Sequence, residues 1–588
     1  MGREHPPSVR LVVRVGVTGH RQEALIDQGY EPEKLGAAVR AVLEHVRQTA
    51  EAVAAASPAL YEGSPSVRLI SPLAEGADRI VAEVALEEGY ALQCPLPFHR
   101  EEYERDFATP ESKQRFEELL DKAQCVLELD GARPTANEAY QAVGRTVLRQ
   151  SDVLIAIWDG KPAERVGGTA QIVTEALTAR MPTVWIESKP PHRLLKASSN
   201  PADPEVWDLS DFTQQINSLL LLPSNKEVKK YAEFRKERQP QWKVALLFRL
   251  FCKVFLWKWP LPKTLRIANF KERSRASWLK TWAPLSGVND AVGEQIEESY
   301  RPQFDWADGL AEILADRYRS SFVATYLMGA CAVLAAFLGW YWGELALIVG
   351  ILGLVGIGKI LRWHERWIDY RLVAEGFRQM EFLASFARVT PSFEPPPFVE
   401  YESSEINWFA WYFRAVVRQA DLLKASVDTE YLRACDRVLR KAIGVQVNYH
   451  HGIASRFHKL SHRLHLRVSP GLFLLTLIAC VLHLLFEHWT TTVFREQVDT
   501  FLIFFAIVLP AFGASIEGIA HQGEFGQIAQ RSKAIQSNLR SLLQELQDPS
   551  RPLTFHRFGQ IADSFCKILL AEQAHWRSLF AGKSIPLP

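Results

Sequence analysis

The sequence predicts an α/β domain in the N-terminal part of the chain, followed by an all-α membrane region with four transmembrane helices. Residues 8–190 alternate short β-prone runs with helical runs, which is typical of a parallel sheet covered by helices. After residue 320, long uncharged apolar runs occur as two close pairs. Because a helix needs about 20 apolar residues to cross a bilayer, we expect each pair to form a membrane hairpin.

The α/β part is expected to contain six strands with helices between them. The predicted strands are residues 11–17, 67–70, 91–95, 125–129, 152–158 and 183–186. The predicted helices are residues 33–55, 76–88, 113–121, 137–149 and 168–179. In such sheets, ligands bind beyond the carboxyl ends of the strands, where helix N-termini converge. Polar residues that follow the strands are therefore the candidate site.

Polar residues and glycines follow three of these strands and begin the neighbouring helices. Glycine lets the backbone approach a ligand, His and Arg offer donors to a phosphate or a base, and bare amides at a helix start bind anions. Carboxylates at such a place cap the helix or accept ribose hydroxyl hydrogens. Each motif alone fits ordinary turns and caps, but together on one sheet edge they favour a nucleotide pocket. The candidate ligand-binding residues are Thr18, Gly19, His20, Arg21, Ser71, Glu75, Asp78, Asp159, Gly160, Gly167, Gly168 and Thr169.

Asn137, Glu138, Tyr140 and Arg145 could also line this pocket. An ordinary surface helix explains these four residues better.

A basic segment follows the α/β part. Residues 226–280 carry sixteen Lys or Arg against four Glu, and they enclose the apolar, aromatic stretch 242–259. Basic residues spaced along such a stretch fit a helix that lies in the membrane interface. They fit equally an amphipathic helix docked on the protein, and both interpretations stay open.

The four apolar runs are long enough to span a membrane. Residues 320–343 contain no Asp, Glu, Lys, Arg or His, and residues 345–358 follow after Glu344 alone. In the second pair, residues 468–486 are interrupted only by His483, and residues 500–516 contain Pro510, which a membrane helix tolerates. Four buried core helices are the alternative, but these runs exceed the usual length of about 12 residues in globular proteins.

Positive charge predicts the orientation. The hairpin tips carry little positive charge, whereas six arginines flank the opposite ends. These arginines are Arg362, Arg366, Arg371, Arg456, Arg463 and Arg467. By the positive-inside rule those ends are cytoplasmic, so we expect a multi-pass protein of the cell inner membrane with both termini in the cytoplasm. The seven cysteines show no paired spacing, which suits a reducing compartment.

The chain is expected to divide into five parts. They are a nucleotide-binding domain at 1–220, a basic linker at 221–299, a first hairpin module at 300–400, a helical connector at 401–449 and a second hairpin module at 450–588. The net charge of +1 favours no class of partner overall, and no nucleic acid polymer is expected. The histidines before the third apolar run lack Cys or carboxylate companions, so neither a metal nor a cofactor is expected.

The motifs of the α/β part resemble a known superfamily. TGHR, SPLAEGADRIVA, DVLIAIWDG and GGTAxIVxxA occur in this order within residues 8–190. They resemble the SLOG superfamily of Rossmann-like domains, which is related to the LOG cytokinin-activating phosphoribohydrolases and to DprA. The resemblance implies binding of nucleotides or nucleotide-derived molecules, and some members sense second messengers in bacterial antiviral systems.

One position departs from the hydrolases of that superfamily. They carry a Gly-Gly-x-Gly-Thr-x-x-Glu signature, whereas Ile172 stands three residues after Thr169. Isoleucine can neither activate water nor stabilise a developing ribosyl cation. We therefore expect binding without turnover and assign no catalytic residue. The alternative is a membrane-anchored hydrolase that cleaves N-glycosidic bonds of nucleotides or NAD-like molecules, with Glu75, Asp78 or Glu175 as the acid.

The membrane half has a resemblance of its own. A charged amphipathic segment follows each hairpin, similar to SLATT-type modules, which pair two transmembrane helices with a cytoplasmic helix and occur beside SLOG domains as predicted pore-forming effectors. Here the module is duplicated, at about 300–400 and 450–550. The resemblance implies an effector that opens the membrane in antiviral defence. We expect a homo-oligomer, because four helices of one chain can pack together without leaving an aqueous path. A plain membrane anchor or scaffold is the alternative.

Overall fold

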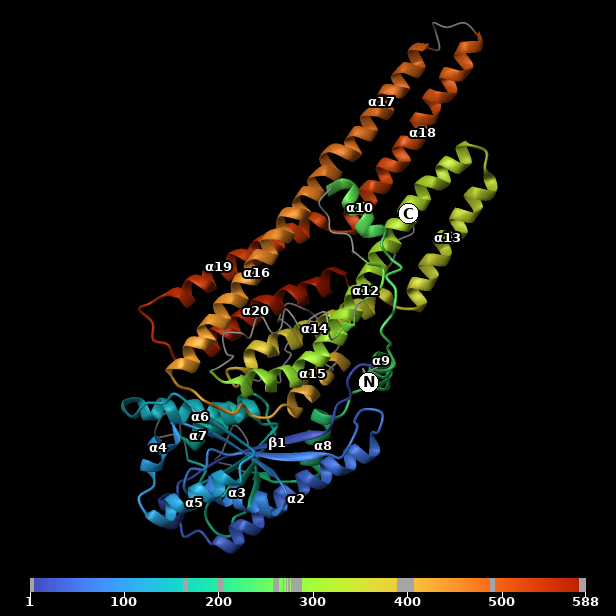
Figure 1. Ribbon diagram of the computed structural model, residues 1–588. Coiled ribbons are helices and arrows are strands. Elements are labelled where there is room, and N and C mark those ends of the chain that lie inside the picture. Colours follow the sequence, from blue (N-terminus) through green and yellow to red (C-terminus); the bar gives the residue numbers. More distant parts are fainter. Residues whose placement is uncertain are drawn as a thin grey trace.

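The computed structural model describes residues 5–161, 168–197, 205–256, 264–267, 269–270, 272, 275, 288–388, 407–486 and 492–580. The α/β domain lies at one end of the molecule, a layer of helices lies in the middle, and two helical hairpins project at the other end (Figure 1). The fold class predicted from the sequence is confirmed, because a Rossmann-like sheet with helices precedes an all-helical region.

The sheet has nine strands within the described residues, in the order β8-β7-β6-β5-β1-β2-β3-β4-β9. The strands are β1 Val12–Gly19, β2 Ser66–Ile70, β3 Ala91–Leu96, β4 Cys125–Glu128, β5 Val153–Trp158, β6 Thr183–Glu187, β7 Leu194–Lys196, β8 Glu205–Val206 and β9 Ala425–Ser426. Strands β1 to β6 pair in parallel, while β7 and β8 are antiparallel additions at one edge. The first six strands overlap the six predicted ones, whereas β7, β8 and β9 were not predicted from the sequence.

Helices cover both faces of the sheet. The helices of this part are α1 Gln22–Asp27, α2 Pro32–Ala56, α3 Ala77–Glu87, α4 Arg100–Tyr103, α5 Pro110–Asp121, α6 Ala136–Gln150, α7 Thr169–Thr178, α8 Leu209–Leu220 and α9 Asn225–Arg235. Helices α2, α3 and α5 lie on one face, and α6 and α7 lie on the face toward the helical layer (Figure 1). Strand β5 is buried along its whole length, which is why it reads as a continuous apolar run.

The helical part combines very long helices with short ones. Its helices are α10 Leu247–Leu256, α12 Asp290–Phe337, α13 Tyr341–Ile360, α14 Trp363–Ala384, α15 Trp408–Gln419, α16 Thr429–Arg463, α17 Ser469–Phe486, α18 Thr492–Gln522, α19 Phe525–Gln547 and α20 Phe555–Phe580. A five-residue π-helical turn at Leu464–Val468 joins α16 directly to α17. The predicted boundary at 449–450 therefore falls inside a continuous helix.

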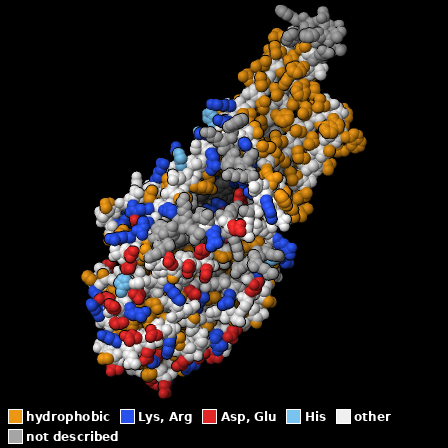
Figure 2. Space-filling view, viewed as in Figure 1, with side chains coloured by type: hydrophobic (Ala, Val, Ile, Leu, Met, Phe, Trp, Pro, Cys, Tyr) orange, Lys and Arg blue, Asp and Glu red, His pale blue; other side chains and the backbone are white. Residues whose placement is uncertain are grey.

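Four helices among the described residues are long and apolar enough to cross a membrane. They form two hairpins, α12 with α13 and α17 with α18, and hydrophobic side chains cover the outside of these hairpins (Figure 2). Charged side chains gather instead over the rest of the visible face (Figure 2). Leu352 of α13 and Leu474 of α17 are 57% and 58% exposed, which suits contact with lipid. His483 of α17 lies 3.4 Å from Asp499 of α18, so the two polar groups meet across the second hairpin.

Within the basic, aromatic stretch at 242–259, helix α10 covers Leu247–Leu256, whereas residues 242–246 are not helical. This helix docks on α12, where Phe248, Phe251 and Cys252 are buried. Leu250 and Val254 on its other face are 50% and 67% exposed. The docked interpretation therefore holds for one face, while contact of the other face with a membrane stays a prediction.

The helical layer and the sheet share one hydrophobic core. Arg418 of α15 donates to Asp152 beside β5 at 2.7 Å, and both side chains are almost fully buried. The backbone N–H of Arg14 in β1 donates to the same carboxylate at 3.0 Å. Arg68 of β2 donates to the carbonyls of residues 418, 419 and 420 at 3.0–3.1 Å. Residues from the connector thus complete the α/β domain, and β9 pairs with β4 at the sheet edge.

Candidate functional site

A cavity of about 580 Å³ opens at the carboxyl ends of β1 and β5. These two strands are neighbours, but the chain continues from β1 toward β2 and from β5 toward β6, in opposite directions along the sheet. Helices from both faces diverge at such a switch point and leave a crevice between the strand ends. The position predicted for a ligand site therefore coincides with a cavity in the structure.

Two glycines hold the loop after β1 close to α3. A Cβ on Gly19 would lie 2.3 Å from Cβ of Ala77 and 2.8 Å from the carbonyl oxygen of Ile157. Gly76 has a φ of +96°, and a Cβ there would lie 2.6 Å from the His20 carbonyl oxygen. Close packing within the protein thus explains why position 76 requires glycine, and it accounts for much of the same requirement at position 19. The result is that His20 and Arg21 are presented at the cavity.

His20, Asp159 and Lys161 form a polar group at the ends of β1 and β5. Nε2 of His20 lies 3.1 Å from Oδ1 of Asp159 and 3.2 Å from the backbone nitrogen of Asp159. Nζ of Lys161 lies 3.4 Å from Oδ2 of Asp159. Burial raises the pKa of Asp159, but the Lys161 backbone N–H and the His20 ring together lower it below its usual value. Asp159 is therefore an ionised acceptor beside two groups that can donate to an anion.

Arg21 lies at the cavity with its guanidinium over the ring of Tyr140, 5.3 Å from the ring centroid. It is also 3.5 Å from Asp106, whose carboxylate accepts the Tyr140 hydroxyl at 2.6 Å and pairs with Arg133. The Arg21 side chain remains 43% exposed. A pre-positioned, accessible guanidinium of this kind can make a bidentate contact with a phosphate.

Asp78 is the buried acid of the cavity. Burial raises the pKa of Asp78 to about 7, although the nearby Arg21 and a hydrogen bond from the backbone of Ala74 oppose the shift. At neutral pH this carboxyl group therefore exchanges between a donating and an ionised form. A protonated Asp78 can donate a hydrogen bond to a ligand oxygen.

The first turn of α7 closes another side of the cavity. Gly168 is its N-cap, and Thr169 and Ala170 follow along the cavity wall. Ile172 also lines the wall and packs against α6, where a Cβ on Gly144 would lie 2.6 Å from Cδ1 of Ile172. Ile172, which stands three residues after Thr169, is thus a packing residue of the cavity wall. Glu175 lies outside the cavity lining, and Arg145 holds it with hydrogen bonds of 2.8–3.2 Å.

Eight of the twelve predicted site residues line the cavity. These are Thr18, Gly19, His20, Arg21, Asp78, Asp159, Gly168 and Thr169. Gly167 lies outside the described residues.

Ser71, Glu75 and Gly160 do not line the cavity. Oγ of Ser71 donates to the Asp78 carbonyl at 3.2 Å and accepts the Leu73 N–H at 3.2 Å, so it holds the turn before α3. Glu75 accepts the Ser112 hydroxyl of α5, and Gly160 has a φ of +81° beside Trp185. The contacts of these three residues within the protein explain their presence in the loops after the strands without a ligand.

The structure adds three residues of α6 to the cavity: Asn137 and Tyr140, which the sequence analysis had set aside, and Gly144, which it had not considered. Their spacing of three and four residues puts them on one face of the helix. That spacing is the feature of the sequence from which these cavity residues could have been predicted. Gln28 and Lys161 also line the cavity, but neither belongs to a recognisable motif. Within the described ranges, no group of three or more His, Cys, Asp or Glu side chains could hold a metal ion.

No protein-family model matches this chain, and neither does any curated protein. The resemblance to SLOG domains rests on the motifs of this sequence, and the resemblance to SLATT modules rests on the arrangement of its apolar and amphipathic segments.

Proposed function

We propose that this protein is a membrane effector whose cytoplasmic α/β domain senses a nucleotide-derived second messenger and whose hairpins then open or disrupt the inner membrane, in bacterial antiviral defence. The observation that carries the proposal is the cavity at the switch point between β1 and β5, lined by His20, Arg21, Lys161 and the start of α7. Donors of this kind suit phosphate, and Asp78 and Asp159 suit hydroxyl or amino groups of a nucleoside. No purely apolar ligand would use this set.

Helix α6 supports coupling between the cavity and the helical layer. Tyr140 and Gly144 line the cavity, while Gln150 at the other end donates to the Ala387 carbonyl just after α14 at 2.9 Å. Burial and the neighbouring Arg388 lower the pKa of Arg149 to about 10, so both guanidinium groups are positively charged at neutral pH. A movement of α6 would change the distance between these like charges at the end of α14. Coupling requires an element with two arrangements that both sites bias, and α6 is the candidate.

The charge distribution supports the orientation. Six arginines flank the ends of the hairpins that join the rest of the protein: Arg362, Arg366, Arg371, Arg456, Arg463 and Arg467. These ends are cytoplasmic by the positive-inside rule, which puts the α/β domain and both termini in the cytoplasm. The protein is then a multi-pass protein of the inner membrane. Several chains assemble, because four helices of one chain can pack together without leaving an aqueous path.

The proposal is tested by a ligand screen on the full chain. The protein, purified in detergent, is scanned for thermal stabilisation by linear and cyclic nucleotides. A ligand at 100 times its Kd stabilises the folded state by about 2.7 kcal/mol, and we expect one nucleotide class to raise the unfolding midpoint by a few degrees. Calorimetry then measures the affinity of each ligand that does so. Failure of every nucleotide at millimolar concentration contradicts the sensor assignment.

A second candidate is an N-glycosidic hydrolase, because two carboxylates, Asp78 and Asp159, line the cavity. After prolonged incubation with the ligand found in the screen, chromatography should recover it intact if the protein only binds. Release of free base that is abolished by Asp78→Asn would establish the hydrolase instead. Glu75→Gln is the matched control, since Glu75 faces Ser112 outside the cavity and its loss should change nothing.

A further inference from the structure

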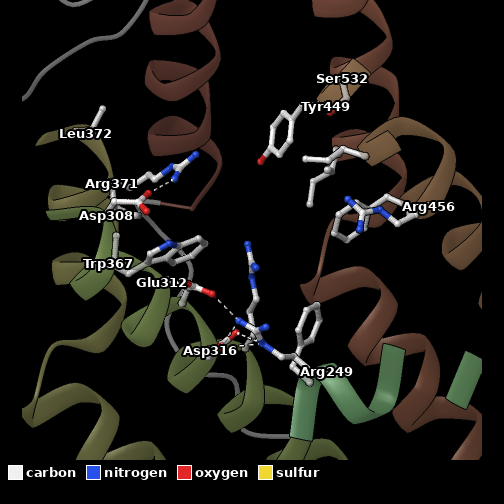
Figure 3. Close-up of a pocket in the computed structure, with 18 residues that line it drawn as sticks. Arg249, Asp308, Glu312, Asp316, Trp367, Arg371, Leu372, Tyr449, Arg456 and Ser532 are labelled. Carbon is white, nitrogen blue, oxygen red and sulfur yellow. Dashed lines mark hydrogen bonds and ion pairs between the residues drawn. The ribbon is translucent and has the colours of Figure 1, made fainter. Parts of the chain in front are cut away.

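A second cavity lies between the long helices of the middle layer, at the base of the two hairpins (Figure 3). It has a volume of about 450 Å³ and is lined by side chains from α10, α12, α14, α16 and α19. This volume falls within the range of about 300–1,000 Å³ that ligand pockets usually occupy. None of its residues belongs to the cavity at the sheet edge.

The acidic groups of this second cavity are already engaged. Asp308, Glu312 and Asp316 follow one another at four-residue intervals along α12. Arg249 of α10 holds Glu312 at 2.9 Å and Asp316 at 2.7 Å, and Arg371 of α14 holds Asp308 at 3.1 Å. The close-up shows these pairs along one side of the space (Figure 3). The carboxylates are thus neutralised by arginines from two other helices.

Arg319 is a further positively charged side chain at this cavity, and it is not a member of these ion pairs. Its guanidinium lies 5.1 Å from the ring centroid of Trp367 and 5.5 Å from that of Phe248. The side chain is half-buried, and within the described part of the chain no hydrogen bond or ion pair to it is found. A guanidinium has five N–H donors, and because Arg319 lines the cavity, an anion that enters the cavity can accept hydrogen bonds from it.

Further donors face the same space from the other wall. Tyr449 and Arg456 of α16 and Ser532 of α19 line the cavity, and the Tyr449 hydroxyl points into the open space (Figure 3). Arg456 donates to the Gly452 carbonyl at 3.2 Å. Hydroxyls and guanidinium groups converging from separate helices are the donor set that binds phosphate oxygens.

The cavity lies at the level where the membrane spans begin. Arg319 immediately precedes residues 320–343, which contain no Asp, Glu, Lys, Arg or His. Helix α10 lines the cavity with Phe248 and Arg249 and exposes Leu250 and Val254. The phosphates of the cytoplasmic leaflet would lie near this height, and basic pockets at this depth bind anionic headgroups.

We propose that this cavity binds a phosphate-bearing anion, with Arg319 as the principal contact. The phosphate belongs either to the headgroup of an anionic phospholipid in the adjacent leaflet or to a soluble phosphate compound. The proposal is independent of the nucleotide sensor, because it uses no residue of the α/β domain. An anion between α12, α14, α16 and α19 would join the bases of both hairpins.

The test compares two probes on the full chain in phosphatidylcholine nanodiscs. In the first arm, the nanodiscs contain increasing fractions of phosphatidylglycerol, and native mass spectrometry after detergent release counts the retained phosphatidylglycerol. In the second arm, inorganic phosphate or glycerol 3-phosphate is added to nanodiscs without phosphatidylglycerol, and the thermal unfolding midpoint is recorded. Retention in the first arm identifies the lipid source, and stabilisation in the second alone identifies the soluble one.

Arg319→Gln should weaken binding of the effective probe by about tenfold or more, because it removes a charged, bidentate donor. Arg317→Gln is the matched control. Arg317 lies two residues earlier on the same helix and lines a separate small cavity with Trp242 and Ile267, so its loss should leave binding unchanged. If Arg319→Gln does not give monodisperse protein, Arg456→Gln replaces it and should also weaken binding. Equal binding by the wild type and these variants in both arms overturns the proposal, as does no binding of either probe.

Discussion

Arg21 carries the sharpest prediction at the residue scale. Its guanidinium is half exposed, lies over Tyr140 and opens into the sheet-edge cavity. A bidentate contact between arginine and phosphate contributes about 1.5–3 kcal/mol. We therefore expect Arg21→Ala to lower the calorimetric affinity for the nucleotide found in the screen more than tenfold.

Arg145→Ala is the matched control for this change. Arg145 belongs to the same domain and is bonded to Glu175 outside the cavity. Its loss should leave the affinity unchanged. An Arg21→Ala protein that binds as tightly as the wild type would remove Arg21 from the site.

Because the pKa of Asp78 is raised, we expect ligand binding to depend on pH. Burial raises its pKa to about 7, so the carboxyl group is protonated below that pH and negative above it. An ionised Asp78 repels an anionic ligand. The repulsion between two unit charges about 10 Å apart, in a medium of effective dielectric constant 20, lowers the affinity roughly tenfold. We expect the affinity to fall as the pH rises from about 6 to about 8.

Asp78→Asn mimics the protonated form and should make the affinity nearly independent of pH over that range. The same carboxyl group affects stability. Its pKa is raised in the folded state, so its contribution is complete at low pH and is lost as the pH rises toward about 7. Calorimetry at several pH values tests the binding, and equal pH profiles for wild type and variant would contradict this role of Asp78.

At the scale of elements, the contact between α15 and the sheet predicts a large effect on stability. Arg418 and Asp152 are both almost fully buried and bonded at 2.7 Å. Removing one partner of a buried ion pair leaves a buried charge and costs about 3–5 kcal/mol. Arg418→Met should therefore lower the thermal midpoint of the full chain clearly.

Arg145→Met is the comparison for Arg418→Met. It removes a partly exposed pair with Glu175, and such pairs contribute about 0–1 kcal/mol. Similar midpoints for the two variants would mean that the sheet and the helical layer are not held together by this contact.

Elements with strong periodicity were predicted well from the sequence. The predicted helix at 137–149 is α6 at Ala136–Gln150, and the predicted strand at 152–158 is β5 at Val153–Trp158. Strand β9 has two residues and is contributed from far along the chain. No local pattern marks so short a strand, because its pairing depends on where α15 places it.

At the scale of the whole molecule, the proposed effector predicts leakage of membranes. The full chain is inserted into dye-loaded vesicles so that the α/β domain faces outward, and the nucleotide found in the screen is added outside. Shifting a closed-to-open balance from 1:99 to 99:1 requires about 5.5 kcal/mol of differential binding, which several sensor domains together can supply. We expect the release of dye to depend on the ligand. We also expect the open membrane path to discriminate poorly among ions, because rings of charge or carbonyls are needed for selectivity.

Vesicles that contain the Arg21→Ala protein should retain their dye at the ligand concentration that causes release from vesicles with the wild type. If the inserted, ligand-bound wild type releases neither dye nor ions, the scaffold or the anchored hydrolase replaces the effector. The full chain is needed for this experiment and for the screen, because α15 and β9 complete the α/β domain. A fragment of residues 1–220 would lack both elements.

The sequence by itself determined the class of fold and the edge of the sheet where the cavity lies. Hydrophobic periodicity and length are local properties, and strand ends in a parallel sheet meet at one edge whatever the details. Only the tertiary structure decided which polar residues reach the cavity. Thr169 and Glu75 both stand near helix starts, yet Thr169 lines the cavity and Glu75 bonds to Ser112 of a neighbouring helix. The same holds for Arg319, whose position between two aromatic rings depends on how α10, α12 and α14 pack, and such contacts between distant segments leave no pattern in the sequence around them.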